Sequence, residues 1–231
     1  MSINNKIPIL YEDEHLIVVD KPAGLPVHKN DFMPKDADYL TKSIGKLKNR
    51  SVYNVHRLDS KTSGVIIMAF TQEAAGFLSS QFEKKQVSKK YFALVKGNPG
   101  EGKFEEKVIV KKKSKFKKPA VTNYRVFSSV ATNLISKENE KVILSLVEII
   151  PETGRWHQIR QHFARNRYDI IGDTHHGDFS LNRMVTEQTG VKRLMLHASE
   201  IAFNHPLEGK EIRVQSELPG SFASIIQELG K

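Results

Sequence analysis

The chain has 231 residues, a formal net charge of +10 at neutral pH and no cysteine. Its length suits one large domain or two small ones with a sizeable core. The basic charge favours a polyanionic partner, either nucleic acid or an anionic membrane surface. The lack of cysteine excludes disulfides and thiolate chemistry and disfavours structural zinc. Because no apolar stretch could cross a bilayer and residues 1–6 lack a signal-peptide core, we expect a soluble, cytoplasmic protein that binds RNA or DNA, not a membrane.

Most of the predicted elements are strands. Short apolar runs predict strands over residues 7–11 and 16–19, separated by an acidic turn, and a short helix follows over 38–48. The run 65–69 predicts a buried strand, after which Thr71 can cap a helix that continues to Phe82. The remaining predictions are strands at about 90–96, 104–110, 121–128, 142–150 and 194–203, and helices at 156–166 and 222–229. This order predicts one α+β domain over residues 1–231, with a mixed, largely antiparallel central sheet and flanking helices.

Two segments look like additions to such a domain. Residues 107–118 contain seven lysines and no acid, which is typical either of a solvated basic loop or of an RNA contact. The interleaved Phe116 and the overall charge favour RNA. Residues 172–192 form a long polar connection between apolar segments, and connections of this length are usually functional or disordered.

Residues 56–64 read His-Arg-Leu-Asp-Ser-Lys-Thr-Ser-Gly and precede the predicted buried strand at 65–69. Taken in isolation, Asp59 is more often a solvated loop residue or a helix cap. A carboxylate at the end of a strand, among cations and hydroxyls, is nevertheless well placed to stay ionised and to attack an electrophile.

Three other runs favour the catalytic reading of Asp59 over the reading as a solvated loop residue. They are Lys-Pro-Ala-Gly-Leu-Pro-Val-His at 21–28, the basic aromatic strand 89–97, and Gly-Arg-Trp-His-Gln-Ile-Arg-Gln-His at 154–162. With the Asp59 run, they resemble the RluA family of pseudouridine synthases, in the order that this family uses, from about residue 10 to residue 212. The resemblance implies a central sheet with a cleft across it. It also implies a catalytic domain that holds RNA without the small N-terminal S4 module of many members, because the strands at 10–19 already belong to that domain.

The resemblance also implies the chemistry. Pseudouridine formation breaks the bond from ribose C1′ to uracil N1 and remakes it to C5, an isomerisation that needs no cofactor. Asp59 matches the family nucleophile, and Arg160 matches the arginine that pairs with it and keeps it ionised. Tyr91 matches the tyrosine that stacks on uracil near C5, and Leu196 matches an apolar residue that lines the base pocket.

Three cationic or titratable residues are candidates for binding the substrate. Arg57 can stack on bases or pair with phosphate once the uridine has left its stack. His56 either does the same or is a structural histidine that binds the backbone, and Lys21 either contacts the RNA backbone or is a surface lysine at a strand end. The family often has Arg or Lys directly after the nucleophile, whereas this chain has Ser60 followed by Lys61, which puts a local phosphate contact in doubt.

A metal site is the alternative for residues 172–178, which include Asp173, His175, His176 and Asp178. A loop of mixed histidine, aspartate and glycine is more often a turn. His157 and His162 also miss the i, i+4 spacing of a helical zinc pair. We therefore predict no metal.

The runs at 118–125, 172–178, 182–183 and 190–198 resemble the branch of the family that modifies a uridine, at position 65, in the T-stem of tRNA. The branch that modifies both ribosomal RNA and tRNA stays open, and we expect a monomer. Two other classes compete. One is a non-catalytic RNA-binding protein on this scaffold. The other is a glycoside hydrolase, which needs a second carboxylate such as Glu148 or Glu152 and fits the basic charge poorly.

Overall fold

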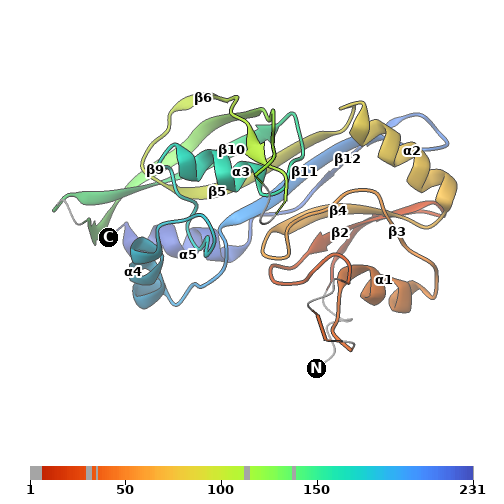
Figure 1. Ribbon diagram of the computed structural model, residues 1–231. Coiled ribbons are helices and arrows are strands. Elements are labelled where there is room, and N and C mark those ends of the chain that lie inside the picture. The colour runs from red at the N-terminus through yellow and green to blue at the C-terminus, as the bar shows by residue number, and fades with distance from the viewer. Residues whose placement is uncertain (1–6, 30–32, 35, 112–114, 137–138, 231) are drawn as a thin grey trace. The chain divides into compact units, whose positions relative to one another are not determined.

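The computed structural model describes residues 7–29, 33–34, 36–111, 115–136 and 139–230. The chain divides into two compact units (Figure 1). Unit 1 comprises Met1–Lys89 and Ala198–Glu217, and unit 2 comprises Lys90–His197 and Leu218–Lys231. Each unit combines strands with helices, and the strand pairs described below are antiparallel. The predicted α+β class is confirmed.

Unit 1 is built on short, apolar strands. They are β1 (Ile9–Glu12), β2 (Leu16–Lys21), β3 (Tyr53–Asn54), β4 (Ser63–Ala69), most of β11 (Leu196–Asn204), and β12 (Glu211–Gln215). Strand β2 lies between β1 and β4, β3 pairs with the end of β4, and β12 pairs with β11. The register places Lys21 opposite Gly64 at the start of β4. The loops next to these two residues, 22–25 and 59–62, therefore meet at one end of the β2–β4 pair.

Two helices cover opposite faces of these strands, α1 (Leu40–Lys48) and α2 (Gln72–Glu83) (Figure 1). All seven residues of β4 are buried, as expected of a strand covered on both faces. Ala74 and Leu78 of α2 belong to the apolar core of this unit. The Thr71 hydroxyl accepts a hydrogen bond from the Ala74 N–H at 3.2 Å, which confirms the predicted helix cap.

Unit 2 is built on four antiparallel strands, in the order β5-β10-β9-β6, of which all but β6 are long. They are β5 (Ser88–Lys96), β6 (Glu101–Phe104), β9 (Thr122–Ile135) and β10 (Lys141–Pro151), and β7 (Val108–Ile109) and β8 (Lys117–Lys118) form a separate hairpin. Helix α3 (Gln158–Arg165) packs on one core cluster of the unit through Ile159 and Phe163. Helices α4 (Phe179–Thr189) and α5 (Gly220–Leu229) pack together on the other cluster (Figure 1).

The structure corrects two predicted elements of unit 2. The strand predicted at 104–110 is divided between β6 and β7, because the charged residues 105–107 between them are exposed and belong to neither strand. The connection predicted at 172–192 contains helix α4. Only Leu181 and Val185 of that helix are buried, so its apolar periodicity is too sparse to read from the sequence.

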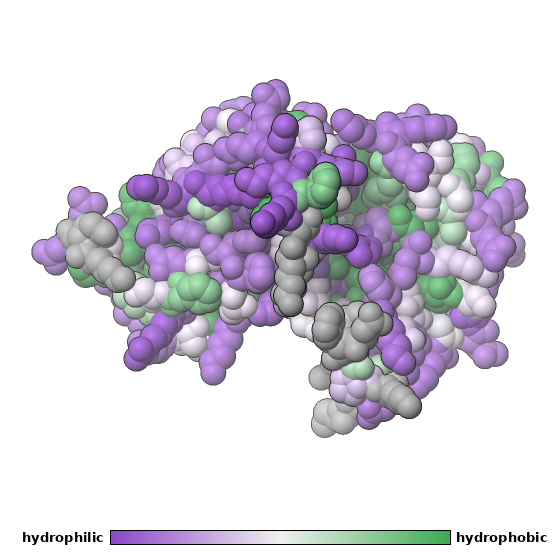
Figure 2. Space-filling model, in the orientation of Figure 1, coloured by the Kyte–Doolittle hydropathy of each residue, from purple (hydrophilic) through white to green (hydrophobic). Residues whose placement is uncertain are grey.

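Hydrophilic residues cover most of the surface that faces the viewer in Figure 2. Among the helices within the described residues, none has the length and apolar character needed to cross a membrane.

Candidate active site

Asp59 lies in the loop that leads into β4 and is half-buried. The carbonyl oxygen of Asp59 accepts a hydrogen bond from the Thr62 N–H at 3.1 Å, which closes a tight turn over residues 59–62. Strand β4 begins one residue after this turn and is buried along its length. The turn therefore places the carboxylate at the end of a rigid strand, as the sequence predicted.

Lys21 binds that turn from within the fold, and its predicted contact with RNA is wrong. The side chain is completely buried. Its Nζ donates to the carbonyl oxygens of Pro22, Leu25 and Ser60, each at 2.9 Å. A side chain without solvent exposure that donates to three backbone carbonyls is not presented to a phosphate in solvent. The lysine ties the loop at 22–25 to the turn of Asp59.

Gly64 allows close approach where the Asp59 run ends. Its φ is +110°, which favours glycine, and a Cβ built on it would lie 2.1 Å from the carbonyl oxygen of Ala198. Gly24, with φ of +92°, donates its N–H to the Ser60 carbonyl oxygen at 2.7 Å. Gly64 is therefore required by close backbone packing, whereas Gly24, whose added Cβ would have nothing within 4 Å, is favoured by its positive φ alone.

His56 has the structural role that the sequence left open. Its Nε2 accepts a hydrogen bond from the Ile67 N–H at 3.0 Å, and its ring stacks on Phe82 with centroids 4.6 Å apart. Burial, assisted by the charge of Lys89, lowers the pKa of His56 to about 3. This hydrogen bond to β4 supports the structural reading of His56 that the sequence left open, and its contact with the substrate stays a prediction. Arg57 beside it is exposed.

Arg160 lies on α3 in unit 2 and is buried, with a side-chain exposure of 4%. Its Nε and NH2 donate to the two carboxylate oxygens of Asp173, each at 2.8 Å. Burial acts to raise the pKa of Asp173, but the hydrogen bonds and charge of Arg160 outweigh it and bring that pKa to about 2. The guanidinium is thus held by a bidentate ion pair, and its predicted pairing with Asp59 stays a prediction.

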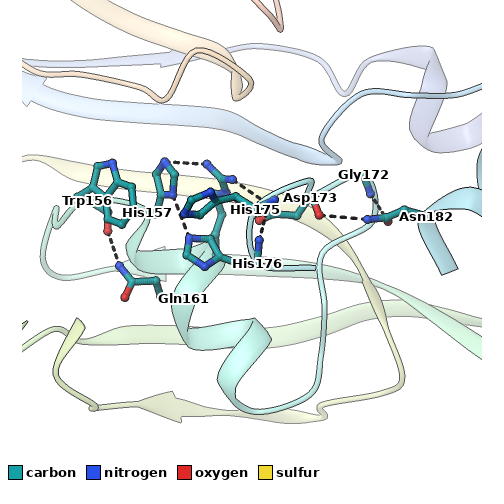
Figure 3. A network of polar contacts seen from close by, with 9 residues as sticks. Trp156, His157, Gln161, Gly172, Asp173, His175, His176 and Asn182 are labelled. Atoms are coloured by element: carbon teal, nitrogen blue, oxygen red, sulfur yellow. Dashed lines mark hydrogen bonds and ion pairs between the residues drawn. The ribbon is translucent and has the colours of Figure 1, made fainter. Parts of the chain in front are cut away.

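A cluster of histidines lies next to Asp173 of this ion pair (Figure 3). NH1 of Arg160 lies 2.9 Å from Nε2 of His157, and Nδ1 of His157 lies 3.0 Å from Nε2 of His176. The backbone N–H groups of His175 and His176 donate to Asp173 Oδ1 at 2.9 and 3.1 Å. The sequence indicated a crowded loop here, but nothing in it indicated that this loop binds Arg160 through Asp173.

The same cluster is the candidate metal site of this structure. The ligand nitrogens of His157, His175 and His176 all lie within 4.8 Å of one another. The two carboxylates considered as ligands are engaged elsewhere. Asp173 binds Arg160, and Asp178 caps α4 by accepting from the Leu181 N–H at 3.0 Å. The donor set is therefore imidazole alone, next to a guanidinium.

Tyr91 and Leu196 also lie in unit 2. Tyr91 is half-buried on β5, opposite Ile149 of β10, and it packs against the same core cluster as the Ile159 side chain of α3. Leu196 is a buried member of that cluster at the first position of β11. Their predicted roles beside uracil stay predictions.

The lysine-rich segment 107–118 forms the hairpin of β7 and β8, with residues 112–114 outside the described part of the chain. Gln161 of α3 anchors this hairpin twice. Its Oε1 accepts from the Ile109 N–H and its Nε2 donates to the Ile109 carbonyl, both at 3.0 Å. Phe116 is 79% exposed. The lysines are thus presented on an element fixed to the helix that carries Arg160.

Glu148 and Glu152 were the candidates for the second carboxylate that a glycoside hydrolase needs, and both are bound to other side chains. Glu148 is buried between Arg125, at 2.8 Å, and Lys90, at 3.5 Å. Glu152 accepts from the Asn123 side chain at 3.0 Å. Both acids are engaged in structural contacts on the β9–β10 side of unit 2.

Comparison with known proteins decides the family. A family model described as RNA pseudouridylate synthase matches residues 15–165. The chain belongs to this family. It is an RNA pseudouridine synthase, an isomerase, and the resemblance to the RluA family is confirmed. The matched range includes the Asp59 run, the loop at 21–28 and helix α3.

Among the relatives of this pseudouridine synthase are two bacterial proteins named tRNA pseudouridine synthase C. The protein of Pasteurella multocida is 39% identical, over 90% of this chain and 90% of its own. That of Yersinia pestis is 36% identical, over 97% of this chain and 91% of its own. A solved structure, human RNA pseudouridylate synthase domain containing 4, is 26% identical with a TM-score of 0.70, and the match covers 96% of this chain and 92% of that one.

Proposed function

We propose that this pseudouridine synthase acts on tRNA and converts uridine 65 in the T-stem to pseudouridine. The observation that carries the proposal is the similarity of nearly the whole chain to relatives named tRNA pseudouridine synthase C. The net charge of +10 and the lysine-rich hairpin of β7 and β8 are consistent with a folded, polyanionic substrate.

Four residues are proposed to bring about the reaction. Asp59 is the nucleophile, and Arg160 forms an ion pair with it that keeps it ionised. Tyr91 stacks on the flipped uracil and Leu196 lines its pocket. The C1′–N1 bond breaks and the C1′–C5 bond forms, N1 gains a proton and C5 loses one, so the atoms balance without a cofactor. Arg57, exposed two residues before Asp59, occupies the space that the uridine leaves or pairs with phosphate.

The test uses the full chain and transcribed tRNA carrying tritium at uracil C5. Isomerisation releases that tritium to water, and chemical mapping then locates the pseudouridine. We expect one modified position, uridine 65, and no reaction when cytidine replaces it. Modification of ribosomal RNA fragments at a similar rate would replace the tRNA assignment with the dual ribosomal and tRNA activity. Binding of tRNA without any tritium release would favour the non-catalytic RNA-binding protein.

Asp59→Asn tests the nucleophile. We expect it to abolish tritium release while tRNA binding stays within a few-fold of the wild type, because the change removes one charge and little volume. The matched control is Asp38→Asn, the same change at an exposed acid whose carboxylate lies 3.4 Å from Lys42. The control should retain full activity. Full activity of Asp59→Asn would refute the assignment.

We further propose that residues 1–231 act as one catalytic domain, as a monomer, in the cytoplasm. A tRNA substrate supports this location in bacteria such as those of the relatives. Light scattering of the protein with and without tRNA tests the monomer, since a dimer would double the mass that the chain contributes.

A further inference from the structure

Three imidazoles gather beside Arg160, and the chemistry proposed above uses none of them. His157 directly precedes α3, and His175 and His176 lie in the loop before α4 (Figure 3). The ring of His157 stacks on Trp156, with centroids 3.8 Å apart and an angle of 16° between the planes. Because the indole fixes the plane of this ring, the positions of both its nitrogens are defined.

The contacts of His157 determine where its proton lies. NH1 of Arg160 is 2.9 Å from Nε2 of His157, and a guanidinium can only donate, so Nε2 accepts. The proton of the neutral ring is therefore on Nδ1, which donates to Nε2 of His176 at 3.0 Å. Since Nε2 of His176 accepts, the proton of that ring is on its own Nδ1. Arg160 thus donates to His157, and His157 donates in turn to His176.

We propose that His157 and His176 form a directional chain of two neutral imidazoles that positions the Arg160 guanidinium. Asp173 binds Nε and NH2, and His157 binds NH1, so all three nitrogens of the guanidinium have a fixed partner within unit 2. His157 and His176 are positioning residues, because they act through Arg160. The effect of this chain on catalysis rests on the proposed function, whereas its existence does not.

The surroundings favour the neutral form of both rings. Burial, with the charge of Arg160, lowers the pKa of His157 to about 3. Burial also lowers the pKa of His176 to about 4, although Asp173 acts in the opposite direction. The charged and titratable groups that act on the two rings are Arg160, Arg165, Asp173 and His175. Protonation of His157 would direct a second N–H at the guanidinium and break the chain at its first link.

A bound metal ion is the competing explanation for the cluster, because the three ligand nitrogens lie within 4.8 Å. Nδ1 of His157 could ligate a metal only if the ring proton moved to Nε2, where it would meet the donor groups of Arg160. The 3.0 Å separation of the His157 and His176 nitrogens is that of a hydrogen bond. The geometry therefore favours the hydrogen-bond chain over a bound metal ion as the explanation for the cluster.

The direct test is nitrogen NMR of the full, ¹⁵N-labelled chain at pH 7 without RNA. The expected result is that His157 and His176 both carry their proton on Nδ1, with signals assigned through His157→Gln and His176→Gln. A proton on Nε2 of either ring, or an imidazolium at pH 7, would overturn the proposal. So would stoichiometric zinc that leaves with a chelator and shifts these signals. Because no RNA is present, this result is independent of the proposed substrate.

Kinetics test the positioning role. His157→Phe keeps the stack on Trp156 but removes both ring nitrogens, and we expect kcat to fall roughly 10- to 100-fold while KM for tRNA stays within about 3-fold. His157→Gln restores an acceptor for NH1 and should recover most of the loss. His176→Phe should reduce kcat by a smaller factor, because His176 is one hydrogen bond further from Arg160. His176→Gln should restore kcat.

The matched control is His175→Phe, the same change at an exposed neighbouring ring that is not part of the hydrogen-bond chain. This variant should leave kcat unchanged. Equal losses in the phenylalanine and glutamine variants of His157 would overturn the positioning role. If the wild type were inactive on tRNA while the NMR result held, the proposed function would fail and the hydrogen-bond chain would stand.

Discussion

Nζ of Lys21 lies 2.9 Å from the carbonyl oxygen of Ser60, so a completely buried ammonium holds the residue that directly follows Asp59. The same carbonyl accepts the Gly24 N–H at 2.7 Å. Two motifs that are 39 residues apart in the sequence are thereby joined at one oxygen. The loop at 22–25 therefore stabilises the turn that contains the proposed nucleophile.

Lys21→Met is predicted to destabilise unit 1 without altering RNA contacts. Methionine keeps the apolar stem but leaves three carbonyls, one of them in a fully buried hydrogen bond, without their charged donor, which should lower the free energy of unfolding by about 3 kcal/mol. Urea unfolding measures this loss. Lys46→Met, at an exposed position on α1, is the control and should change stability by less than about 0.5 kcal/mol. Unchanged stability, with a weaker salt dependence of tRNA binding, would return Lys21 to the RNA interface.

Gly64→Ala is predicted to be strongly destabilising for two separate reasons. The positive φ of +110° is unfavourable for alanine, and the added Cβ would lie 2.1 Å from the Ala198 carbonyl oxygen, which is backbone and cannot turn aside. We expect a loss of at least about 3 kcal/mol. Gly76→Ala is the matched control, because Gly76 lies inside α2 with nothing within 4 Å of its added Cβ. That change should raise stability by about 0.5 to 1 kcal/mol. Similar thermal midpoints for the two variants would contradict the close packing around Gly64.

The neutral ring of His56 predicts a pH dependence of stability. Its pKa is lowered to about 3 in the folded state, so between about pH 3 and its ordinary value of 6.5 the unfolded chain binds more protons. The stabilisation is complete above pH 6.5 and is lost as the pH falls toward 3. His56→Gln should therefore reduce the slope of unfolding free energy against pH near pH 5 by up to about 1 kcal/mol per unit. Above pH 8 the two slopes should coincide, and parallel slopes at pH 5 would show that His56 is protonated in the fold.

What the sequence predicted well was local. The run ending at Gly64 places Asp59 beside a buried strand within a few residues, and apolar runs located β2, β4 and β10. Thr71 was found as a helix cap because its partner, Ala74, is three residues away. Each of these predictions depends on residues that are close in the sequence, and a periodic pattern of apolar residues gives information only about such local structure.

What the sequence could not predict depends on distant partners. Burial of Lys21 follows from an acceptor 39 residues away, and a basic residue near a strand end is usually exposed. Asp173 was considered as a metal ligand because its neighbours are histidines, whereas its partner is Arg160 on α3. The direction of the hydrogen bonds through His157 follows only from the guanidinium beside it. These relationships are fixed by packing between segments, not by local pattern.

The lysines of the hairpin β7–β8 should bind phosphate. Lys115, Lys117 and Lys118 are exposed on or directly before β8, and β8 pairs with β7, which Gln161 fixes to α3. Replacing all three with glutamine should raise KM for tRNA and reduce the log–log salt slope of binding by roughly 0.9 for each phosphate that is no longer neutralised. The charge-matched control replaces the exposed lysines Lys46, Lys84 and Lys85 of unit 1, which changes the net charge equally. If the two triple variants showed the same salt slope, the hairpin would be a solvated basic surface whose effect on RNA is only that of net charge.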